Sequence, residues 1–426
     1  MKIPLEPVRG MRDLIYPDSE GIEYLKSTFS DLASSYGYEL VIPPTIELFS
    51  LFAVKSGPEI KKSMYVFEDK AGRQVCLRPE FTAGVARIYL RSFRNRPKPV
   101  KIYYVGSAFR YEEPQSGRYR EFIQAGVEYI GEPSYYADVE LLLLIRDYYR
   151  AVGLKDYRVK LGSMGIYRKL FNSWRIPEET QDLIIHYLDK KMLDDALKLI
   201  KSSSVEADLK VIEELASFSS EDPQELERYA GEVNVKEDIK EEVRSLAKIL
   251  SILKDLNVPN PYVDLGFARG LAYYTGLIFE IITPALNFSI GGGGRYDGLI
   301  ALYGGVQTPA TGFALGIDRL YLALENSGWE MPKKRLRVGL IALISDLKYV
   351  DLTSSRLREV GLSVDVRITT KKKVSDLISD FSSLGYDYVA ILGEKEYSSR
   401  SVTIKNLKLR TQKTLDIDSI KSGELP

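Results

Sequence analysis

The sequence predicts an α+β core built on an antiparallel sheet, a helical insertion inside that core, and a small C-terminal α/β domain. Three observations support this prediction. The chain has 426 residues, and at roughly 100–200 residues per domain it needs more than one. Residues 100–130 have the pattern of a long apolar hairpin, and strands alternate with helices after residue 334. We expect the core at 1–160 and 258–328, the insertion at 161–257 and the C-terminal domain at 334–426.

Composition excludes several classes of protein. Apolar residues make up 45% of the chain, and no apolar run approaches the roughly 18 residues that span a bilayer. The N-terminus lacks the apolar stretch of a secretory signal, so we expect a cytoplasmic location. With one cysteine, Cys76, and one histidine, His186, a zinc cluster or a cysteine–histidine catalytic pair is not expected. Catalysis is left to arginine, carboxylate, tyrosine or an external metal. The formal net charge of zero means that any nucleic acid must bind to local basic patches.

The first predicted elements are a helix and a short strand. Apolar residues recur at spacings of three and four from Asp18 to Tyr36, and Gly37 ends the helix. An extended segment at 38–42 follows, and Pro43-Pro44 ends it because proline has no N–H to donate to a neighbouring strand.

The hairpin pairs residues 100–110 with residues 121–130 around a charged loop. Alternate side chains of a strand share a face, so Gln124 and Glu128 point to the same side. Such a face is also typical of solvated surface salt bridges, and that alternative stays open. The arginines at the base and tip of the loop offer the rigid donor forks that a polyphosphate needs.

Helical spacing dominates the predicted insertion, after which strand patterns return. We expect strands at 263–267, 277–282 and 288–290, and a helix near Gly316. The C-terminal domain alternates apolar strands with helices, which indicates a small, mainly parallel sheet.

Three further segments are candidates for binding chemistry. Glu80 and Thr82 lie beside a proline, where Glu80 could hold an ammonium group or the segment could simply cap a helix. Arg269 precedes the tyrosine pair Tyr273-Tyr274, which could line a planar polar ring or could be a chance pair in a tyrosine-rich chain. Four glycines at 291–294 indicate a strand that something approaches closely, with a flexible loop as the alternative.

Arg319 lies in the first turn of the helix predicted near Gly316. A cation is unfavourable there because the helix N-terminus carries partial positive charge, and an anion would compensate.

Together and in this order, these segments resemble the histidyl-tRNA synthetase family of class II aminoacyl-tRNA synthetases over nearly the whole chain. The opening Arg9-Gly10-Met11-Arg12-Asp13 is similar to the family's, and the segment ending at Pro43-Pro44 resembles the class motif that builds a homodimer. Residues 109–124 and 312–320 resemble the two class motifs that bind ATP. Segments 269–276 and 290–299 resemble the two motifs specific to histidine enzymes.

The resemblance implies a histidine–tRNA ligase that joins L-histidine to tRNA(His) through an adenylate, with Mg²⁺ accompanying ATP. It implies that Arg110, Arg269 and Arg319 are catalytic and hold the phosphates. The residues implied to bind histidine are Glu80, Thr82, Gln124, Glu128, Tyr273 and Tyr274. Arg110, Glu112, Gln115 and Arg319 are implied to bind ATP. No editing domain is expected, because a polar pocket can discriminate by about 10⁴–10⁵ unaided.

Two positions depart from the family's pattern. Ala272 stands where the relatives usually have Asp, and Tyr111 stands where they often have His. Residues 334–426 resemble the family's anticodon-binding domain, and Lys333, Lys334, Arg335, Lys371, Lys372 and Lys373 are candidate phosphate contacts. The main alternative is the synthetase-like regulatory subunit of ATP phosphoribosyltransferase, which senses histidine but usually lacks that domain and the catalytic arginines. A class II enzyme for proline, threonine or glycine is a third possibility that the segment 269–276 disfavours.

Overall fold

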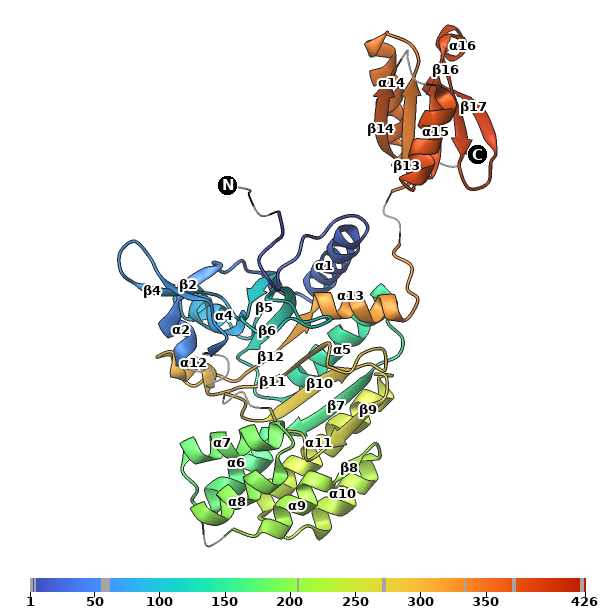
Figure 1. Ribbon diagram of the computed structural model, residues 1–426. Helices are drawn as coiled ribbons and strands as arrows, with labels where there is room; N and C mark the ends of the chain where they lie inside the picture. Colours follow the sequence, from blue (N-terminus) through green and yellow to red (C-terminus); the bar gives the residue numbers. More distant parts are fainter. Residues whose placement is uncertain are drawn as a thin grey trace. The chain divides into compact units, whose positions relative to one another are not determined.

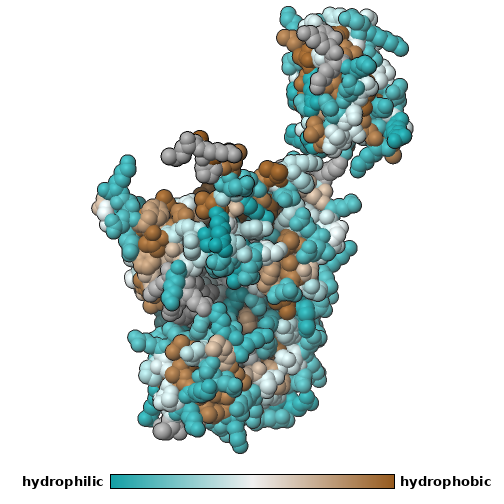
Figure 2. Space-filling view, viewed as in Figure 1, coloured by the Kyte–Doolittle hydropathy of each residue, from teal (hydrophilic) through white to brown (hydrophobic). Residues whose placement is uncertain are grey.

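The computed structural model describes residues 3, 5–54, 62–204, 207–269, 273–332, 335–369, 373–421 and 425–426. The chain forms two compact units, Met1–Trp329 and Glu330–Pro426 (Figure 1). Within the described ranges, none of the helices combines the length and apolar character needed to cross a membrane. Hydrophilic and hydrophobic side chains are interspersed over the visible face of both units (Figure 2).

A nine-stranded sheet organises the first unit. Its order is β1-β5-β6-β12-β11-β10-β7-β9-β8, and every pairing is antiparallel except β1 with β5 and β7 with β9. The strands are β1 (Glu39–Leu40), β5 (Val100–Phe109), β6 (Glu121–Ile130), β7 (Arg158–Ser163), β8 (Ser219–Ser220), β9 (Pro261–Asp264), β10 (Leu277–Ile282), β11 (Gly291–Arg295) and β12 (Ala310–Gly316). The predicted antiparallel sheet is therefore confirmed.

Helices cover one face of this sheet, where the core lies. They are α1 (Asp18–Ser35), α5 (Tyr135–Val152) and α13 (Ile317–Asn326). Fully buried Phe29 of α1 meets Tyr103, Tyr148 and Phe313 edge to face. The sheet's other face carries buried polar side chains such as Glu128 and Gln124, and this division decides where the site lies.

A smaller sheet, in the order β2-β4-β3, stands beside the main one. Its elements and the nearby helices are β2 (Ile46–Leu48), α2 (Phe49–Ala53), β3 (Val66–Glu68), β4 (Gln74–Leu77), α4 (Thr82–Ile88), the π-helix Tyr89–Phe93 and α12 (Leu299–Leu302). Cys76 is fully buried there with Phe52, Met64 and Ala83, so it is a small core residue.

In the described part of the insertion the chain forms six helices, shown in green below the sheet in Figure 1. They are α6 (Met164–Ser173), α7 (Glu178–Asp189), α8 (Leu193–Ser203), α9 (Leu209–Ser217), α10 (Pro223–Glu232) and α11 (Glu237–Asp255). The residues before α6, Leu161–Ser163, belong to β7 and pair with β10 in the main sheet.

Two strand boundaries differ from the sequence prediction. The segment 288–290 is not a strand, and the strand instead begins at Gly291 and contains the four glycines. Glycine has a low intrinsic strand preference, but here it is paired on both sides by β10 and β12. Likewise β9 ends at Asp264, short of the predicted Phe267.

The second unit is a five-stranded sheet in the order β14-β13-β15-β16-β17. The first three strands are parallel and the last two antiparallel, which confirms the predicted α/β character. Its elements are β13 (Arg337–Ala342), α14 (Leu347–Glu359), β14 (Ser363–Ile368), α15 (Val374–Ser383), β15 (Tyr388–Leu392), α16 (Glu394–Ser398), β16 (Ser401–Asn406), β17 (Gln412–Asp416) and the 3₁₀ turn Ile417–Ser419. Separate apolar clusters join α14 and α15 to this sheet.

Candidate active site

Glycines line the face of the main sheet that the core helices leave uncovered. Gly106, Gly126, Gly312 and Gly292 lie on β5, β6, β12 and β11, and register places them on one face. A Cβ atom on Gly312 would lie 2.0 Å from a carboxylate oxygen of Glu128, and one on Gly292 would lie 2.7 Å from the guanidinium of Arg269. The missing side chains therefore let functional groups lie flat on the backbone.

Glu128 is the buried carboxylate of this face. It is 2% exposed, and its two oxygens accept hydrogen bonds from Tyr104, at 3.3 Å, and from Tyr296. Burial, followed by the charges of Glu128 and Glu80, raises the pKa of Tyr104 well above its ordinary value. The Tyr104 phenol therefore stays protonated and acts as a donor to Glu128.

Two more tyrosines lie near this carboxylate, and an amide lies on the same face of β6. Gln124 is 9% exposed, and its Oε1 has no hydrogen-bond partner among the described residues. The Tyr273 ring lies 4.8 Å from that of Tyr274 and 5.8 Å from that of Tyr296, centroid to centroid. Burial, then Tyr274 and the carboxylates, raises the pKa of Tyr273 well above its ordinary value. The cluster thus offers flat apolar surfaces with protonated hydroxyls and a buried acceptor that lacks a partner.

Thr82, the first residue of α4, and Glu80, which lies just before that helix, are close to the same cluster. Thr82 is close enough to Tyr104 to act on the pKa of its hydroxyl, which it lowers against the larger effect of burial. The Glu80 carboxylate accepts the backbone N–H groups of Thr82 and Ala83, the latter at 3.0 Å, so it caps α4 as the structural alternative anticipated. A carboxylate has about four lone-pair positions, so this capping leaves room for a ligand donor.

Arginines converge at the other end of the site. Burial, and then the neighbouring Arg118, Arg110 and Arg269, lower the pKa of Arg319, while Glu112 acts in the opposite direction. Arg319 donates to the backbone oxygens of Gly117, at 3.3 Å, and Ser289, at 2.9 Å. Like charges held this close favour an anionic ligand between them.

Arg110 and Arg269 come from different segments, the first directly after β5 and the second between β9 and β10. Arg110 follows β5, donates to the Pro79 carbonyl at 3.0 Å and lies over the Phe122 ring. Arg269 donates to Glu280 on β10 at 3.1 Å. Burial alone would lower the pKa of Arg269. The interactions with Tyr274 and Glu280 together outweigh burial, so the pKa is raised. The same ion pair acts on Glu280 in the opposite direction. Burial alone would raise the pKa of Glu280, but the charge of Arg269 helps to overcome this effect, and the pKa is lowered.

The loop between β5 and β6 carries the remaining predicted ATP-binding residues. Glu112 forms an ion pair with Arg118 at 2.9 Å. Gln115 exchanges backbone hydrogen bonds with Arg118, which closes the tip of the loop at Gly117. Glu128 and Arg269 both pack against glycines on one face of the main sheet, and Arg269 neighbours Arg319, whereas Ala272 lies outside the described residues.

Sequence reasoning missed Tyr104 and Glu280, included Arg118 only among the arginines of the loop, and assigned no role to Tyr296. Tyr104 reads as one apolar strand residue among several, and only its pairing opposite Gly126 aims its hydroxyl at Glu128. Glu280 is the acidic residue in the apolar strand β10, a signal that could have marked it as functional.

The oxygen-bearing side chains of the site fit Mg²⁺ only if the phosphates of the nucleotide supply most of its ligands. Across the described ranges, no three His, Cys, Asp or Glu side chains come together as a metal site. Mg²⁺ usually keeps one or two carboxylates plus phosphates and waters. Glu112 and Glu280 are carboxylates within the arginine cluster, although each already contacts an arginine.

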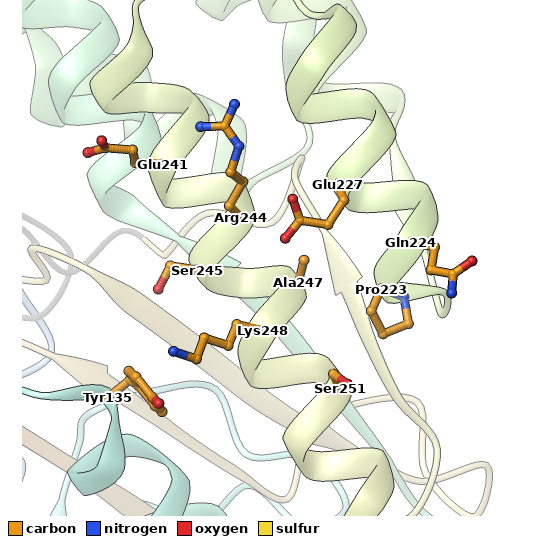
Figure 3. Close-up of a pocket in the computed structure, with 10 residues that line it drawn as sticks. All are labelled: Tyr135, Pro223, Gln224, Glu227, Glu241, Arg244, Ser245, Ala247, Lys248 and Ser251. Carbon is orange, nitrogen blue, oxygen red and sulfur yellow. The ribbon is translucent and has the colours of Figure 1, made fainter.

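A second hollow lies in the insertion and is unrelated to this surface. It has a volume of about 580 Å³ between α10, α11 and Tyr135, and Glu227 faces Arg244 across it (Figure 3). Acidic and basic side chains line this hollow in equal number, so its lining has no formal net charge. Within the described chain, none of its lining residues has a buried side-chain polar atom that lacks a partner.

The fold and this site define a class II aminoacyl-tRNA synthetase. The crystal structure of histidyl-tRNA synthetase from S. aureus superimposes with a TM-score of 0.67 and 26% sequence identity, over 98% of both chains. This agreement confirms the predicted class II fold.

Family models match both units. Residues 10–320 match the model described as Histidyl-tRNA synthetase, and residues 338–423 match the Anticodon binding domain. The chain is 42% identical over 423 residues to a protein of Saccharolobus solfataricus named "Histidine--tRNA ligase", covering 98% of each. It is 41% identical to a protein of the same name from Sulfolobus acidocaldarius, covering 98% of this chain and 97% of the relative. The chain belongs to the histidyl-tRNA synthetase family.

Proposed function

We propose that the protein is a histidine–tRNA ligase that activates L-histidine with ATP and transfers the histidyl group to the 3′ end of tRNA(His). The observation that supports this proposal is the position of two residue clusters on one face of the main sheet. A buried carboxylate held by tyrosine hydroxyls lies on the same glycine-lined sheet face as the cluster of guanidinium groups.

Glu128 would accept the N–H of the imidazole, while a tyrosine hydroxyl donates to the other ring nitrogen. Gln124 offers its unpaired Oε1, and Glu80 its remaining lone pairs, to the ammonium group. An amino acid without the ring would leave these buried groups unsatisfied, which is the basis of strong discrimination.

Activation needs positioning rather than a general base. The ionised carboxylate of histidine attacks the α-phosphorus, a new P–O bond forms and pyrophosphate leaves. Arg110 and Arg269 would neutralise charge at that phosphorus from two sides, and Arg319 would hold the γ-phosphate. In the second step a hydroxyl of the tRNA 3′ end attacks the histidyl carbonyl and AMP leaves.

The separate segments would divide this work. Residues 1–160 and 258–328 would catalyse both steps, and residues 334–426 would bind the anticodon. Arg335 and Lys373 are exposed in that unit and are candidate phosphate contacts. Lys333, Lys334, Lys371 and Lys372 lie outside the described residues. We assign no specific role to the insertion at 161–257.

Three further features belong to the proposal. Mg²⁺ would enter with ATP and supply charge neutralisation between its phosphates. A homodimer would cover the apolar residues of the segment that resembles the dimer motif, where Ile42 is 83% exposed and Leu40 is 52% exposed. A cytoplasmic location fits a single, buried, unpaired cysteine.

The decisive experiment is ATP–pyrophosphate exchange with each amino acid in turn, followed by charging of tRNA(His). Exchange should depend on histidine. Exchange driven by another amino acid would disprove the specificity, and histidine binding without exchange would favour the regulatory-subunit alternative.

The role of Arg269 is tested in the same assay. Arg269→Ala should lower the exchange rate at least about tenfold, because a transition-state charge contact is lost. Arg158→Ala, which removes a partly exposed ion pair with Glu221, is the matched control and should stay within about twofold. An unchanged rate in Arg269→Ala would disprove its catalytic role.

A further inference from the structure

The N-terminal residues 9–12 contact both sides of the arginine cluster. The guanidinium of Arg12 donates from Nη2 to Asp318 at 2.5 Å and from Nη1 to the Tyr119 hydroxyl at 2.9 Å. Its central carbon lies 3.8 Å from the centroid of the Tyr119 ring. Arg12 thus joins the loop between β5 and β6 to the first turn of α13.

Backbone contacts reinforce this junction. The carbonyl of Gly10 accepts the Arg120 N–H at 2.7 Å, and the carbonyl of Arg9 accepts from the Arg120 side chain at 3.2 Å. Gly10 has a φ of +86°, and a Cβ atom there would lie 2.7 Å from the Arg120 side chain. The chain therefore needs glycine at this point to lie against the loop. We call the side chain of Arg12 and these two carbonyls the N-terminal clasp.

Asp318 transmits the position of the clasp to the ATP-binding arginine. Its side chain is 4% exposed, and its second oxygen accepts the backbone N–H of Ile123 on β6 at 2.6 Å. The next residue is Arg319, which in turn donates to Gly117 at the tip of the loop. Asp318 is thus fixed between the clasp and β6, and Arg319 is fixed with it.

Like charges face each other where the loop meets α13. Arg118, Arg110 and Arg269 all disfavour the charged form of Arg319, so holding the loop here has an electrostatic cost that a polyphosphate would offset. Ordering a mobile loop when ATP binds would cost binding free energy, whereas a loop that is already held in place avoids this cost.

Resting on the function proposed above, we propose that Arg12 is a positioning residue for ATP. By joining Asp318 to Tyr119, it holds the loop and Arg319 at the spacing that a triphosphate requires. It does not contact the histidine-binding cluster of Glu128, Gln124 and the tyrosines, so its effect is confined to the nucleotide.

The test compares Arg12→Ala with Arg9→Ala in the full-length protein. Arg9 belongs to the same segment and contacts the same loop through Glu113, but both side chains are 73% exposed, and its carbonyl survives the substitution. We expect Arg12→Ala to raise the KM for ATP in pyrophosphate exchange at least tenfold while the KM for histidine stays within twofold. Arg9→Ala should change neither by more than twofold.

A second variant separates positioning from simple destabilisation. Arg12→Ala leaves the buried Asp318 unpaired, which could lower the melting temperature. In Arg12→Ala/Asp318→Asn the unpaired charge is gone and the amide oxygen still accepts from Ile123. The KM defect for ATP should persist while the melting temperature recovers. Recovery of both together would overturn the proposal, as would equal effects on the two KM values.

ATP binding measured directly by calorimetry, without an amino acid, distinguishes this proposal from the function it rests on. If the wild-type protein fails to exchange with histidine, the proposed function fails. The clasp is still supported by at least tenfold weaker ATP binding in Arg12→Ala, and it is refuted by unchanged binding.

Discussion

Among single residues, Glu128 carries the selection of the amino acid in the proposed function. A carboxylate that is 2% exposed is costly unless donors surround it, and two tyrosine hydroxyls supply them. In the proposed function, its remaining lone pairs would accept the N–H of the imidazole. The phenols therefore orient the acid as well as stabilise it.

Removing one of these phenols should affect histidine more than ATP. Tyr296→Phe deletes a hydrogen bond to a charged, buried acceptor, worth about 1.5–3 kcal/mol. We expect the KM for histidine in pyrophosphate exchange to rise about tenfold or more, with the KM for ATP within about threefold.

Tyr149→Phe is the matched control. Tyr149 is fully buried, and its hydroxyl has no hydrogen-bond partner among the described residues, so its loss should leave both KM values within about twofold. Equal effects of Tyr296→Phe on the two substrates would remove Tyr296 from the histidine pocket.

Residue-scale prediction succeeded where the groups were close in sequence. Gln124 and Glu128 were expected on one face because a strand alternates, and the structure places them there. Tyr104 lies on β5, the partner strand, and the register of the pairing decides which residue of β6 lies opposite it. Register comes from the hairpin as a whole, so the sequence of β5 alone could not identify Tyr104 as the donor to Glu128.

Among the elements, β11 shows how tertiary pairing overrides local preference. Its four glycines disfavour a strand on their own, yet β10 and β12 pair with it along its length. The sequence indicated close approach at these glycines but misplaced the start of the strand. By contrast, α1 was predicted almost to its ends, because its apolar spacing and the following Gly37 are local signals.

A methyl group on the glycine-lined face should abolish histidine binding. In Gly312→Ala the new Cβ would lie 2.0 Å from the Glu128 carboxylate and 2.6 Å from both the Tyr296 hydroxyl and the Val127 carbonyl. Such overpacking costs about 1–3 kcal/mol of unfolding free energy, and the displaced carboxylate loses its ligand. Exchange activity and chemical denaturation measure the two effects.

Gly231→Ala in α10 is the comparison for this change. Nothing lies within 4 Å of its Cβ position, and alanine is the better helix former by up to about 1 kcal/mol. That variant should keep full activity with equal or slightly higher stability. A fully active Gly312→Ala would contradict the close packing of Glu128 on the sheet.

For the whole molecule, each unit has its own apolar core. One large cluster runs through the first unit, and two smaller clusters lie within the second. The change in sequence pattern near residue 334 indicated this division, because alternating strands and helices imply a separate sheet.

Deleting Glu330–Pro426 should therefore separate the two reactions. We expect histidine-dependent pyrophosphate exchange to stay within about tenfold of wild type, whereas charging of tRNA(His) falls at least about a hundredfold because anticodon and phosphate contacts are lost. Exchange and charging assays on the same preparation measure both. Loss of exchange in a deletion variant that still melts cooperatively would show that the second unit takes part in activation.

The glycines beneath Glu128 and Arg269 also limit how this pocket can evolve. Any replacement of glycine adds atoms, so mutation can make the pocket shallower but never deeper. A descendant that accepts a bulkier amino acid must gain space elsewhere, by shortening the side chains that surround the pocket. If Tyr274 is one of them, the change falls beside Arg269, so substrate size and catalysis would change together in the proposed mechanism.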